Sequence, residues 1–455
     1  MATRTREAKS SKHGLLLTAL IGVAAGAAPL ATAQTVNEEF KLTASDGHAD
    51  DNFGKAVAID AGRVVIGSPF NDKAGTDTGT VYVYNALTGS EIVKFRASDA
   101  APNDTLGHSV AIDGTLVAAG AMNADSILYS NSGAAYLFDV TTGNQLFKFT
   151  PDTPVPGGQF GNAIALDGGV VAVGAHYYGV SGSQPGYVYL FDATTGTQSR
   201  VLTASDGANE DQFGWSVDIA DGLVVVGAPR DDDNGNNSGS VYVFDASTGT
   251  QLWKLTASDG AAQDRFGWSV AIHNDLIAVG SYLHDANASN AGAVYLYDAQ
   301  TGAELTKITS PSPAANDWFG FDVALDDDIL VALSGKSPVY TFDLNSGVAL
   351  EELAGSDSVS GDSFGYTAAV WEGIAVVGAL YDDDNGTDSG SAYVFDVSCR
   401  ADLNGDGFLD TSDVTIFLDL YDDGDPMADW NHDGSIDYFD VQAFISDVNA
   451  GCPHS

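Results

Sequence analysis

The segment DQFGWSVDIADGLVVVGAP, from Asp211 to Pro229, returns 53 residues later as DRFGWSVAIHNDLIAVGSY, from Asp264 to Tyr282. The Phe-Gly pair near its start marks seven copies along the chain, with Leu in place of Phe in the second copy. The first residue of each pair is Phe53, Leu106, Phe160, Phe213, Phe266, Phe319 or Phe364, at spacings of 53, 54, 53, 53, 53 and 45. Self-similarity at a fixed period of this length indicates a repeat architecture.

Each copy predicts four short strands separated by Gly- and Asp-rich turns. In the fourth copy these strands are FGWSVDIA, LVVVGAP, SVYVFDA and TQLWKLTA. Four antiparallel strands in about 50 residues are typical of a propeller blade, which buries both faces only by stacking on its neighbours. The tyrosine of the third strand follows Phe-Gly by 29 or 30 residues in six copies, but Tyr340 follows by only 21. We therefore expect an all-β, seven-bladed propeller of four-stranded antiparallel blades, with a deletion between strands two and three of the sixth.

The two ends of the repeat region complement each other. The seventh copy stops at Ser398 without a fourth strand, whereas EEFKLTASDG near the N-terminus matches QLWKLTASDG of the fourth copy. We expect residues 37–45 to pair with the last blade. Such pairing would close the ring and remove two exposed strand edges.

The run FGxSVAI, VVVGAP and GSVYVF resembles the FG-GAP repeats of the integrin α subunits over residues 36–398. The resemblance implies a seven-bladed surface scaffold for adhesion or ligand binding. Integrin-type blades often carry a DxDxDG calcium loop between strands one and two. Here that connection is a hairpin such as IDGTL, IADGL or LDDDI, which is too short to wrap a cation, so we do not extend those metal sites to this chain.

The first 33 residues have the pattern of a secretory signal peptide. Four basic residues precede an apolar run from Leu15 to Leu30, and Ala-Thr-Ala follows, which predicts cleavage after Ala33. A membrane anchor is the alternative, but the run is short and interrupted by Gly and Pro. We expect a bacterial protein that is secreted or associated with the cell surface, with a propeller at 34–398 and a second module at 399–455.

Charge restricts the partners. The chain has 62 acidic and 18 basic residues, for a net charge of −44. Such a surface repels nucleic acid and anionic lipid and favours Ca²⁺ or cationic partners, but we favour solubility and adaptation to a salty habitat as its cause. We expect a monomer that binds neither nucleic acid nor membrane after signal cleavage.

Two groups of residues are candidates for a ligand-binding face of the propeller. The residue after Phe-Gly is aromatic in four consecutive copies, which suits stacking on sugar rings or gripping a peptide; packing between blades is the alternative reading. Acidic residues cluster between strands two and three, where turns and solvated loop tips are the alternative to a Ca²⁺ or ligand rim. The candidates are Trp215, Trp268, Phe321 and Tyr366, with Asp231, Asp233, Asp382 and Asp384.

The C-terminal segment carries two calcium-loop motifs, ADLNGDGFLDTSD and ADWNHDGSIDYFD, 27 residues apart. Alternate oxygen ligands around an obligatory glycine let such a loop wind around one ion, so we expect two Ca²⁺ ions. Positions 1, 3, 5, 7, 9 and 12 are Asp402, Asn404, Asp406, Phe408 (through its carbonyl), Asp410 and Asp413 in the first loop, and Asp429, Asn431, Asp433, Ser435, Asp437 and Asp440 in the second.

Each loop precedes a predicted helix with the same apolar spacing, and no helix precedes the first loop. This arrangement resembles the duplicated loop-helix of type I dockerins, and the bracketing Cys399 and Cys452 resemble the GC-type variety. An even cysteine count in an exported protein predicts a disulfide between them. The resemblance implies a cohesin-like or other surface partner. It would be contacted through loop positions 10 and 11, which are Thr411, Ser412, Tyr438 and Phe439.

No catalytic motif is recognisable. The chain has no HExxH, GxSxG, P-loop or GxGxxG context, and its histidines are scattered over different repeats. VFDASTGTQLWKLTA resembles the outer strand of quinoprotein repeats, but Trp253 of that phrase occurs in one copy only. We therefore predict a non-catalytic binding or adhesion protein with a glycan or protein ligand. A tethered propeller enzyme acting on polysaccharide and a structural spacer are the alternatives.

Overall fold

The computed structural model describes residues 34–176, 185–335, 338–344, 347–397, 403, 411–424, 428, 430 and 435–450. The predicted signal peptide, Cys399 and Cys452 lie outside these residues, as do positions 1 and 3–9 of calcium loop one and positions 1 and 3–6 of loop two.

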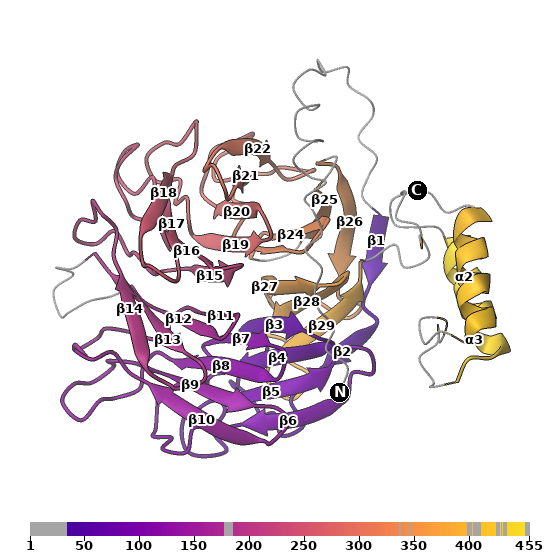
Figure 1. The fold of residues 1–455 in the computed structure, drawn as a ribbon, viewed down its shortest axis with the longest axis horizontal. Coiled ribbons are helices and arrows are strands. Elements are labelled where there is room, and N and C mark those ends of the chain that lie inside the picture. The colour runs from indigo at the N-terminus through magenta and orange to yellow at the C-terminus, as the bar shows by residue number, and fades with distance from the viewer. Residues whose placement is uncertain are drawn as a thin grey trace. The chain divides into compact units, whose positions relative to one another are not determined.

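Seven antiparallel sheets form the blades of a propeller around a central axis (Figure 1). In each blade the first strand is innermost and the fourth is outermost. Blades one to three comprise β3 (Ala56–Asp60), β4 (Arg63–Ser68), β5 (Thr80–Asn85) and β6 (Glu91–Phe95); β7 (Ser109–Asp113), β8 (Leu116–Ala121), β9 (Ala134–Asp139) and β10 (Asn144–Phe149); and β11 (Ile164–Asp167), β12 (Val170–Ala175), β13 (Tyr187–Asp192) and β14 (Gln198–Leu202).

The remaining four blades repeat this order and confirm the predicted number. They comprise β15 (Val217–Ala220), β16 (Leu223–Ala228), β17 (Ser240–Asp245) and β18 (Gln251–Leu255); β19 (Ser269–His273), β20 (Leu276–Ser281), β21 (Ala293–Asp298) and β22 (Glu304–Ile308); β23 (Asp322–Leu325), β24 (Ile329–Leu333), β25 (Val339–Asp343) and β26 (Ala349–Ala354); and β27 (Phe364–Trp371), β28 (Ile374–Ala379), β29 (Ser391–Asp396) and β2 (Phe40–Leu42).

The N-terminal segment closes the ring. Strand β2 pairs antiparallel with β29, with Lys41 opposite Tyr393, which confirms the predicted pairing with the last blade. The structure adds a contact that the repeat pattern did not predict. Strand β1 (Gln34–Asn37) pairs in parallel with β26, so the sixth blade has five strands and the N-terminal segment joins two blades.

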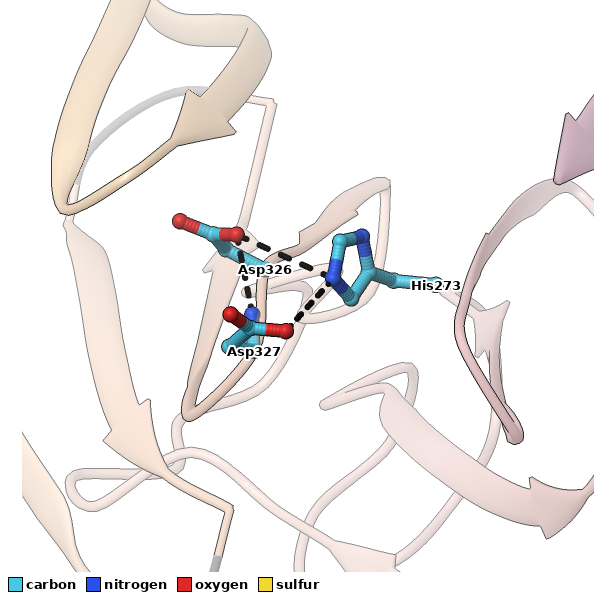
Figure 2. A group of neighbouring side chains, drawn as sticks. All are labelled: His273, Asp326 and Asp327. Atoms are coloured by element: carbon cyan, nitrogen blue, oxygen red, sulfur yellow. Dashed lines mark hydrogen bonds and ion pairs between the residues drawn. The ribbon is translucent and has the colours of Figure 1, made fainter. Parts of the chain in front are cut away.

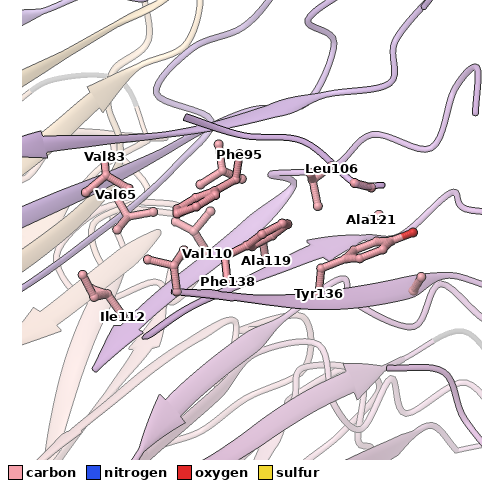
Figure 3. Close-up of a cluster of buried hydrophobic side chains, with 14 of the residues drawn as sticks. Val65, Val83, Phe95, Leu106, Val110, Ile112, Ala119, Ala121, Tyr136 and Phe138 are labelled. Atoms are coloured by element: carbon pink, nitrogen blue, oxygen red, sulfur yellow. The ribbon is translucent and has the colours of Figure 1, made fainter. Parts of the chain in front are cut away.

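The hydrophobic core lies between blades rather than within them. In Figure 3, Val65 and Val83 of blade one meet Val110 and Phe138 of blade two, and Phe95 stacks on Phe138 with ring centroids 4.7 Å apart. Successive residues of a strand point to opposite faces. Each middle strand therefore contributes alternate side chains to the two neighbouring interfaces, and every blade depends on both neighbours for burial.

The Phe-Gly and Gly-Ala-Pro elements of the repeat meet across these interfaces. The Gly267 backbone, with a φ of 83°, approaches Gly227 of the preceding blade so closely that a Cβ on Gly227 would lie 2.1 Å from the Gly267 carbonyl oxygen. Glycine is needed at both positions because a side chain would force the blades apart. The sixth blade has Leu333 at the equivalent position of its second strand.

Recurring acidic residues form hydrogen bonds and ion pairs with a tyrosine and a lysine in each of several blades. Tyr295 is fully buried, and its hydroxyl donates to Asp259 at 2.7 Å, which also pairs with Lys307 at 2.8 Å. Equivalent Tyr–Asp–Lys clusters recur in five blades: Tyr82–Asp46–Lys94, Tyr136–Asp99–Lys148, Tyr242–Asp206–Lys254, Tyr295–Asp259–Lys307 and Tyr393–Asp357–Lys41. The ASDG segment thus anchors the outer strand to the third.

Two helices follow the propeller in sequence, α2 (Thr411–Asp423) and α3 (Tyr438–Ala450). Phe417 of α2 stacks face to face on Phe444 of α3, with centroids 4.0 Å apart, and Trp430 meets both edge-on. The predicted helices and their apolar contacts at Phe417 and Phe444 are confirmed. None of the helices that the structure describes has the length and apolarity to cross a bilayer.

Candidate functional site

The first strands of the seven blades line a central channel with a cavity of about 450 Å³. The residue that follows each Phe-Gly pair stands at the start of this lining, because the glycine turns the chain from the blade interface into the innermost strand. Its side chain is half-buried in every blade. Together these side chains form a seven-membered ring, which we call the channel ring: Lys55, His108, Asn162, Trp215, Trp268, Phe321 and Tyr366.

Four consecutive members of the channel ring form an aromatic arc. The ring centroids of Trp215 and Trp268 are 4.4 Å apart, those of Trp268 and Phe321 are 5.8 Å apart, and those of Phe321 and Tyr366 are 5.6 Å apart. The structure shows the packing alternative directly, and it leaves the binding alternative as a prediction. The rings pack on one another across blade boundaries, and they also line the channel cavity.

The polar half of the channel ring begins at Lys55. Its ammonium group lies 4.5 Å from the ring centroid of Tyr366 and donates to the Tyr366 hydroxyl at 2.8 Å. Burial lowers the pKa of His108 to about 3, with Lys55 adding to the shift, so His108 is uncharged at neutral pH. Asn162 donates to the Trp215 carbonyl at 3.0 Å. This half therefore offers one cation and two neutral polar groups.

Two further rings extend the arc, and the sequence did not single them out. Tyr282 lies 4.6 Å from Trp268, and His176 meets Trp215 edge-on at 4.8 Å, both as centroid distances. Both residues come directly after the second strand of their blade, where other copies have proline, methionine, leucine or glycine. Aligning the copies at that position would have revealed this departure.

The acidic candidates make internal contacts. Asp231 is buried and accepts from the Tyr242 hydroxyl at 3.0 Å, and Lys254 pairs with Asp233 at 2.6 Å. In the seventh blade the same interactions recur, with Lys41 lying 3.0 Å from Asp382 and 2.7 Å from Asp384. One lysine pairs with three carboxylates in each of these two blades. Because these contacts within the blade already engage the four aspartates, we leave them out of the ligand site.

One cluster of potential metal ligands lies at the turns between first and second strands. Figure 2 shows the His273 ring directed at Asp326 and Asp327 of the next blade, with Nε2 2.9 Å from Asp327 Oδ1 and 3.9 Å from Asp326 Oδ1. Asp326 also accepts the backbone N–H groups of Asp327 and Gly373. These bonds join blades five, six and seven, which accounts for the cluster without a metal.

The C-terminal candidates are described only in part. Asp413 and Asp440, at position 12 of the two loops, are fully buried in the first turns of α2 and α3. Ser435 and Asp437 are described beside Asp440, whereas Asp402, Asn404, Asp406, Phe408, Asp410, Asp429, Asn431 and Asp433 lie outside the described residues. Thr411, Ser412, Tyr438 and Phe439 are all exposed.

Comparison with solved structures gives a weak likeness. The crystal structure of the computationally designed Ika8 protein matches 79% of this chain and 99% of its own, with 18% sequence identity and a TM-score of 0.48. We base no inference on it. No curated protein matches the chain.

Comparison with protein families is informative. The FG-GAP repeat matches six segments, residues 36–84, 90–138, 144–191, 197–244, 250–297 and 349–395. Each segment begins at or near the outermost strand of one blade and continues into the next. The unmatched interval contains most of the sixth blade, which has Leu333 in place of glycine and the shortened connection. Since the matched segments cover more than half of its residues, the chain belongs to the FG-GAP repeat family.

Proposed function

We propose that this protein is an exported, non-catalytic binding protein whose propeller binds a saccharide at the aromatic arc. The observation that carries the proposal is the row of four touching aromatic rings along one side of the channel cavity. Flat aromatic faces stack on the apolar faces of sugar rings and lose little conformational entropy on binding. A cavity of about 450 Å³ suits a small part of a larger ligand.

The chemistry of the channel ring supports binding rather than turnover. His176 is buried and His108 is half-buried, and desolvation lowers the pKa of each to about 3, far from the range in which a histidine exchanges protons at neutral pH. Asp218 and Asp322, which also line the cavity, each accept a backbone N–H from the next blade at 2.8 and 3.0 Å. These carboxylates hold blades together.

The test is calorimetric titration of neutral oligosaccharides into the full-length secreted protein. Trp215→Ala and Trp268→Ala should each lower affinity tenfold or more. Leu305→Ala, which removes an exposed apolar side chain from outer strand β22, should leave it unchanged. Equal affinity in all four proteins would refute the site, and hydrolysis or lyase products in the titration mixture would favour the tethered enzyme.

We further propose that residues 399–455 form a calcium-folded, dockerin-like module that attaches the protein to a surface partner. Two observations support it. Asp413 and Asp440 are buried carboxylates at equivalent places, and buried carboxylates are ordinarily paired or bound to metal. The donors that the motifs supply are oxygen atoms only, which suit Ca²⁺. Asp413, Ser435, Asp437 and Asp440 are the described residues that would hold the two ions.

The exposed apolar side chains of the module suggest how a partner is contacted. Tyr438 and Phe439 are 66% and 61% exposed, and Ile445 on the same helix is 49% exposed. Tyr438 and Ile445 are seven residues apart and therefore lie on one face of α3. The first copy has Thr411 and Ser412 at the equivalent loop positions, which favours partner binding through the second copy.

A pull-down from cell-surface extract tests the module. The full chain should recover a partner in the presence of Ca²⁺ and lose it in EDTA, while a chain ending at Ser398 should recover none. Tyr438→Ala with Phe439→Ala should abolish capture. Thr411→Ala with Ser412→Ala is the matched control in the first copy. Recovery that is unaffected by EDTA and by truncation would refute the docking proposal.

A further inference from the structure

Two arginines lie at the junction between blades four and five, on the side of the channel where the aromatic arc begins. Arg230 follows β16 by two residues, and Arg265 directly precedes Phe266 of the next Phe-Gly pair. Both line a polar cavity of about 280 Å³. They meet because the loop after the second strand of one blade hydrogen-bonds to the segment that enters the next blade, as in the bond from Arg265 N–H to the Asn237 carbonyl at 3.3 Å.

Neither arginine side chain has a hydrogen-bond or ion-pair partner among the residues that the structure describes. The Nε atoms of Arg230 and Arg265 are buried, and neither has a hydrogen-bond partner among the described residues. The two guanidinium groups also form no ion pair within that part of the chain, although Glu210 and Asp232 line the same cavity. By contrast, six described basic residues are paired with carboxylates: Lys41, Lys94, Arg96, Lys148, Lys254 and Lys307.

Such a pair is costly to the folded protein. Two like charges at one cavity repel each other, and a buried donor without an acceptor loses the hydrogen bond that it makes to water. The cost appears in the pKa of Arg265, which burial and the charge of Arg230 together lower. The chain has a net charge of −44, so carboxylates to relieve this cost are abundant, yet no carboxylate of the described residues forms an ion pair with either arginine.

Comparison of the blades with one another shows that the pair is specific to this junction. The position of Arg230 is occupied by Phe70, Asn123, Leu283 and Tyr381 in other blades. The position of Arg265 is occupied by Asn52, Thr105, Gln159, Gln212, Trp318 and Ser363. The seventh blade has almost the same loop, with Tyr381-Asp-Asp-Asp-Asn in place of Arg230-Asp-Asp-Asp-Asn. The fold therefore does not require an arginine at either position.

The arginine pair adjoins the aromatic arc, because Trp268 of the arc donates its backbone N–H to the Arg265 carbonyl at 3.1 Å. Tyr282, which touches Trp268, is close enough to both arginines that their charges oppose the rise in its pKa caused by burial. His176, which touches Trp215, is close to Arg230, whose charge helps burial to lower the histidine pKa. The cationic cavity and the stacking surface are thus neighbouring parts of one face.

We propose that Arg230 and Arg265 form an anion-binding subsite that recognises the carboxylate or sulfate group of an acidic saccharide whose ring stacks on the adjoining arc. The inference rests on the saccharide-binding function proposed above and assigns its ligand class. Guanidinium groups present paired N–H donors that match the two oxygens of a carboxylate or sulfate, and such charge-assisted bonds are about twice as strong as neutral ones. An acidic peptide could supply the same carboxylate, but the four flat rings beside it favour a sugar.

The test compares matched short oligosaccharides by calorimetry with the full-length protein. The probes are trigalacturonic acid, its methyl ester, a sulfated galactotriose and an aspartate-containing tripeptide. Short probes are chosen because the net charge of −44 repels long polyanions. Trigalacturonic acid or the sulfated trisaccharide should bind at least tenfold more tightly than the ester, and which of the two binds better identifies the anion.

Two substitutions introduce residues that other copies of the repeat have at the positions of Arg265 and Arg230, so they are compatible with the local backbone. Arg265→Gln copies Gln159 and Gln212, which have the same left-handed backbone, with φ of 50° and 61° against 60° at Arg265. Arg230→Leu copies Leu283. Each should reduce affinity for the acidic probe tenfold or more without changing affinity for the ester. Arg200→Gln, on outer strand β14, removes the same charge away from the cavity and should have no effect.

The outcomes separate the two proposals. If acidic and esterified probes bind equally, or if Arg265→Gln behaves like Arg200→Gln, the anion subsite is refuted while saccharide binding stands. If no saccharide binds, both proposals fail. Preference for the tripeptide over every saccharide would assign the arginine pair to a peptide ligand and overturn the saccharide class.

Discussion

Glu351 lies opposite Gln34 of the N-terminal segment and makes the stability of this part of the ring depend on pH. It lies in β26, is fully buried, and both of its carboxylate oxygens lack a hydrogen-bond partner within the described residues. Burial raises its pKa from 4.5 to about 7, and the charge of Asp396 adds to the shift. The folded protein therefore holds a proton on Glu351 at a pH where the unfolded chain has lost it.

The sign and size of the effect follow from this difference. Because the pKa is higher in the folded state, the group contributes most stability below pH 4.5 and loses that contribution as the pH rises through 7. A rise from 4.5 to about 7 is worth at most about 3–4 kcal/mol of unfolding free energy, at about 1.4 kcal/mol for each pH unit. Replacing Glu351 with leucine, of similar size and without charge, should remove this loss.

The assay is the thermal midpoint of the wild type and of Glu351→Leu at pH 5 and pH 8. For a propeller of this size, about 3 kcal/mol corresponds to roughly 4 °C, so the advantage of the variant should be a few degrees larger at pH 8. Glu352→Leu, on the opposite face of β26 and partly exposed, is the control and should give the same difference at both pH values. If Glu351→Leu raised the thermal midpoint by the same amount at pH 5 and pH 8, the assignment of Glu351 as a buried carboxyl without a partner would be refuted.

The remaining predictions concern the repeat itself. Gly227→Ala places a methyl group against the Gly267 carbonyl and should lower the free energy of unfolding by about 1–3 kcal/mol, measured by denaturant titration. Gly222→Ala, at an open turn, is the control and should show only the smaller cost of a positive φ. Tyr242→Phe removes a hydroxyl whose single proton lies between two carboxylate acceptors, each 3.0 Å from the hydroxyl oxygen. It should cost about 1–3 kcal/mol in the same assay, with no change in saccharide affinity. Deletion of residues 34–42 exposes the edge of β29, so we expect a lower thermal midpoint and concentration-dependent aggregation by light scattering; an unchanged midpoint would contradict the closure role of β2.

The candidate site shows where the sequence is sufficient and where it is not. The position of the aromatic arc within the repeat is visible along the chain, because Trp215, Trp268, Phe321 and Tyr366 occupy one register in four copies. Whether those rings face the channel, a neighbouring blade or both depends on the angle between blades. The structure shows both contacts, which strand parity alone could not decide.

The role of the acidic residues, by contrast, could not be predicted from the sequence. The sequence shows that aspartates recur beside every blade, but a carboxylate on a loop tip and one that anchors a tyrosine look the same along the chain. Asp231 and Asp382 each bind a tyrosine hydroxyl from the third strand of the blade and a lysine from the adjacent fourth strand. Their role as partners of the tyrosine and the lysine depends on the outer strand lying beside the loop, which only the tertiary structure shows.

The sequence by itself determined the number of blades, their four-stranded pattern and the closure by the N-terminal strand. These follow from repetition, because a unit that cannot bury its own faces must stack on copies of itself until the ring closes. Only the tertiary structure brought Arg230 and Arg265 together, and it alone revealed the parallel pairing of β1 with β26. Both contacts join different repeats, and spacing along the chain does not specify which loops meet across a blade junction.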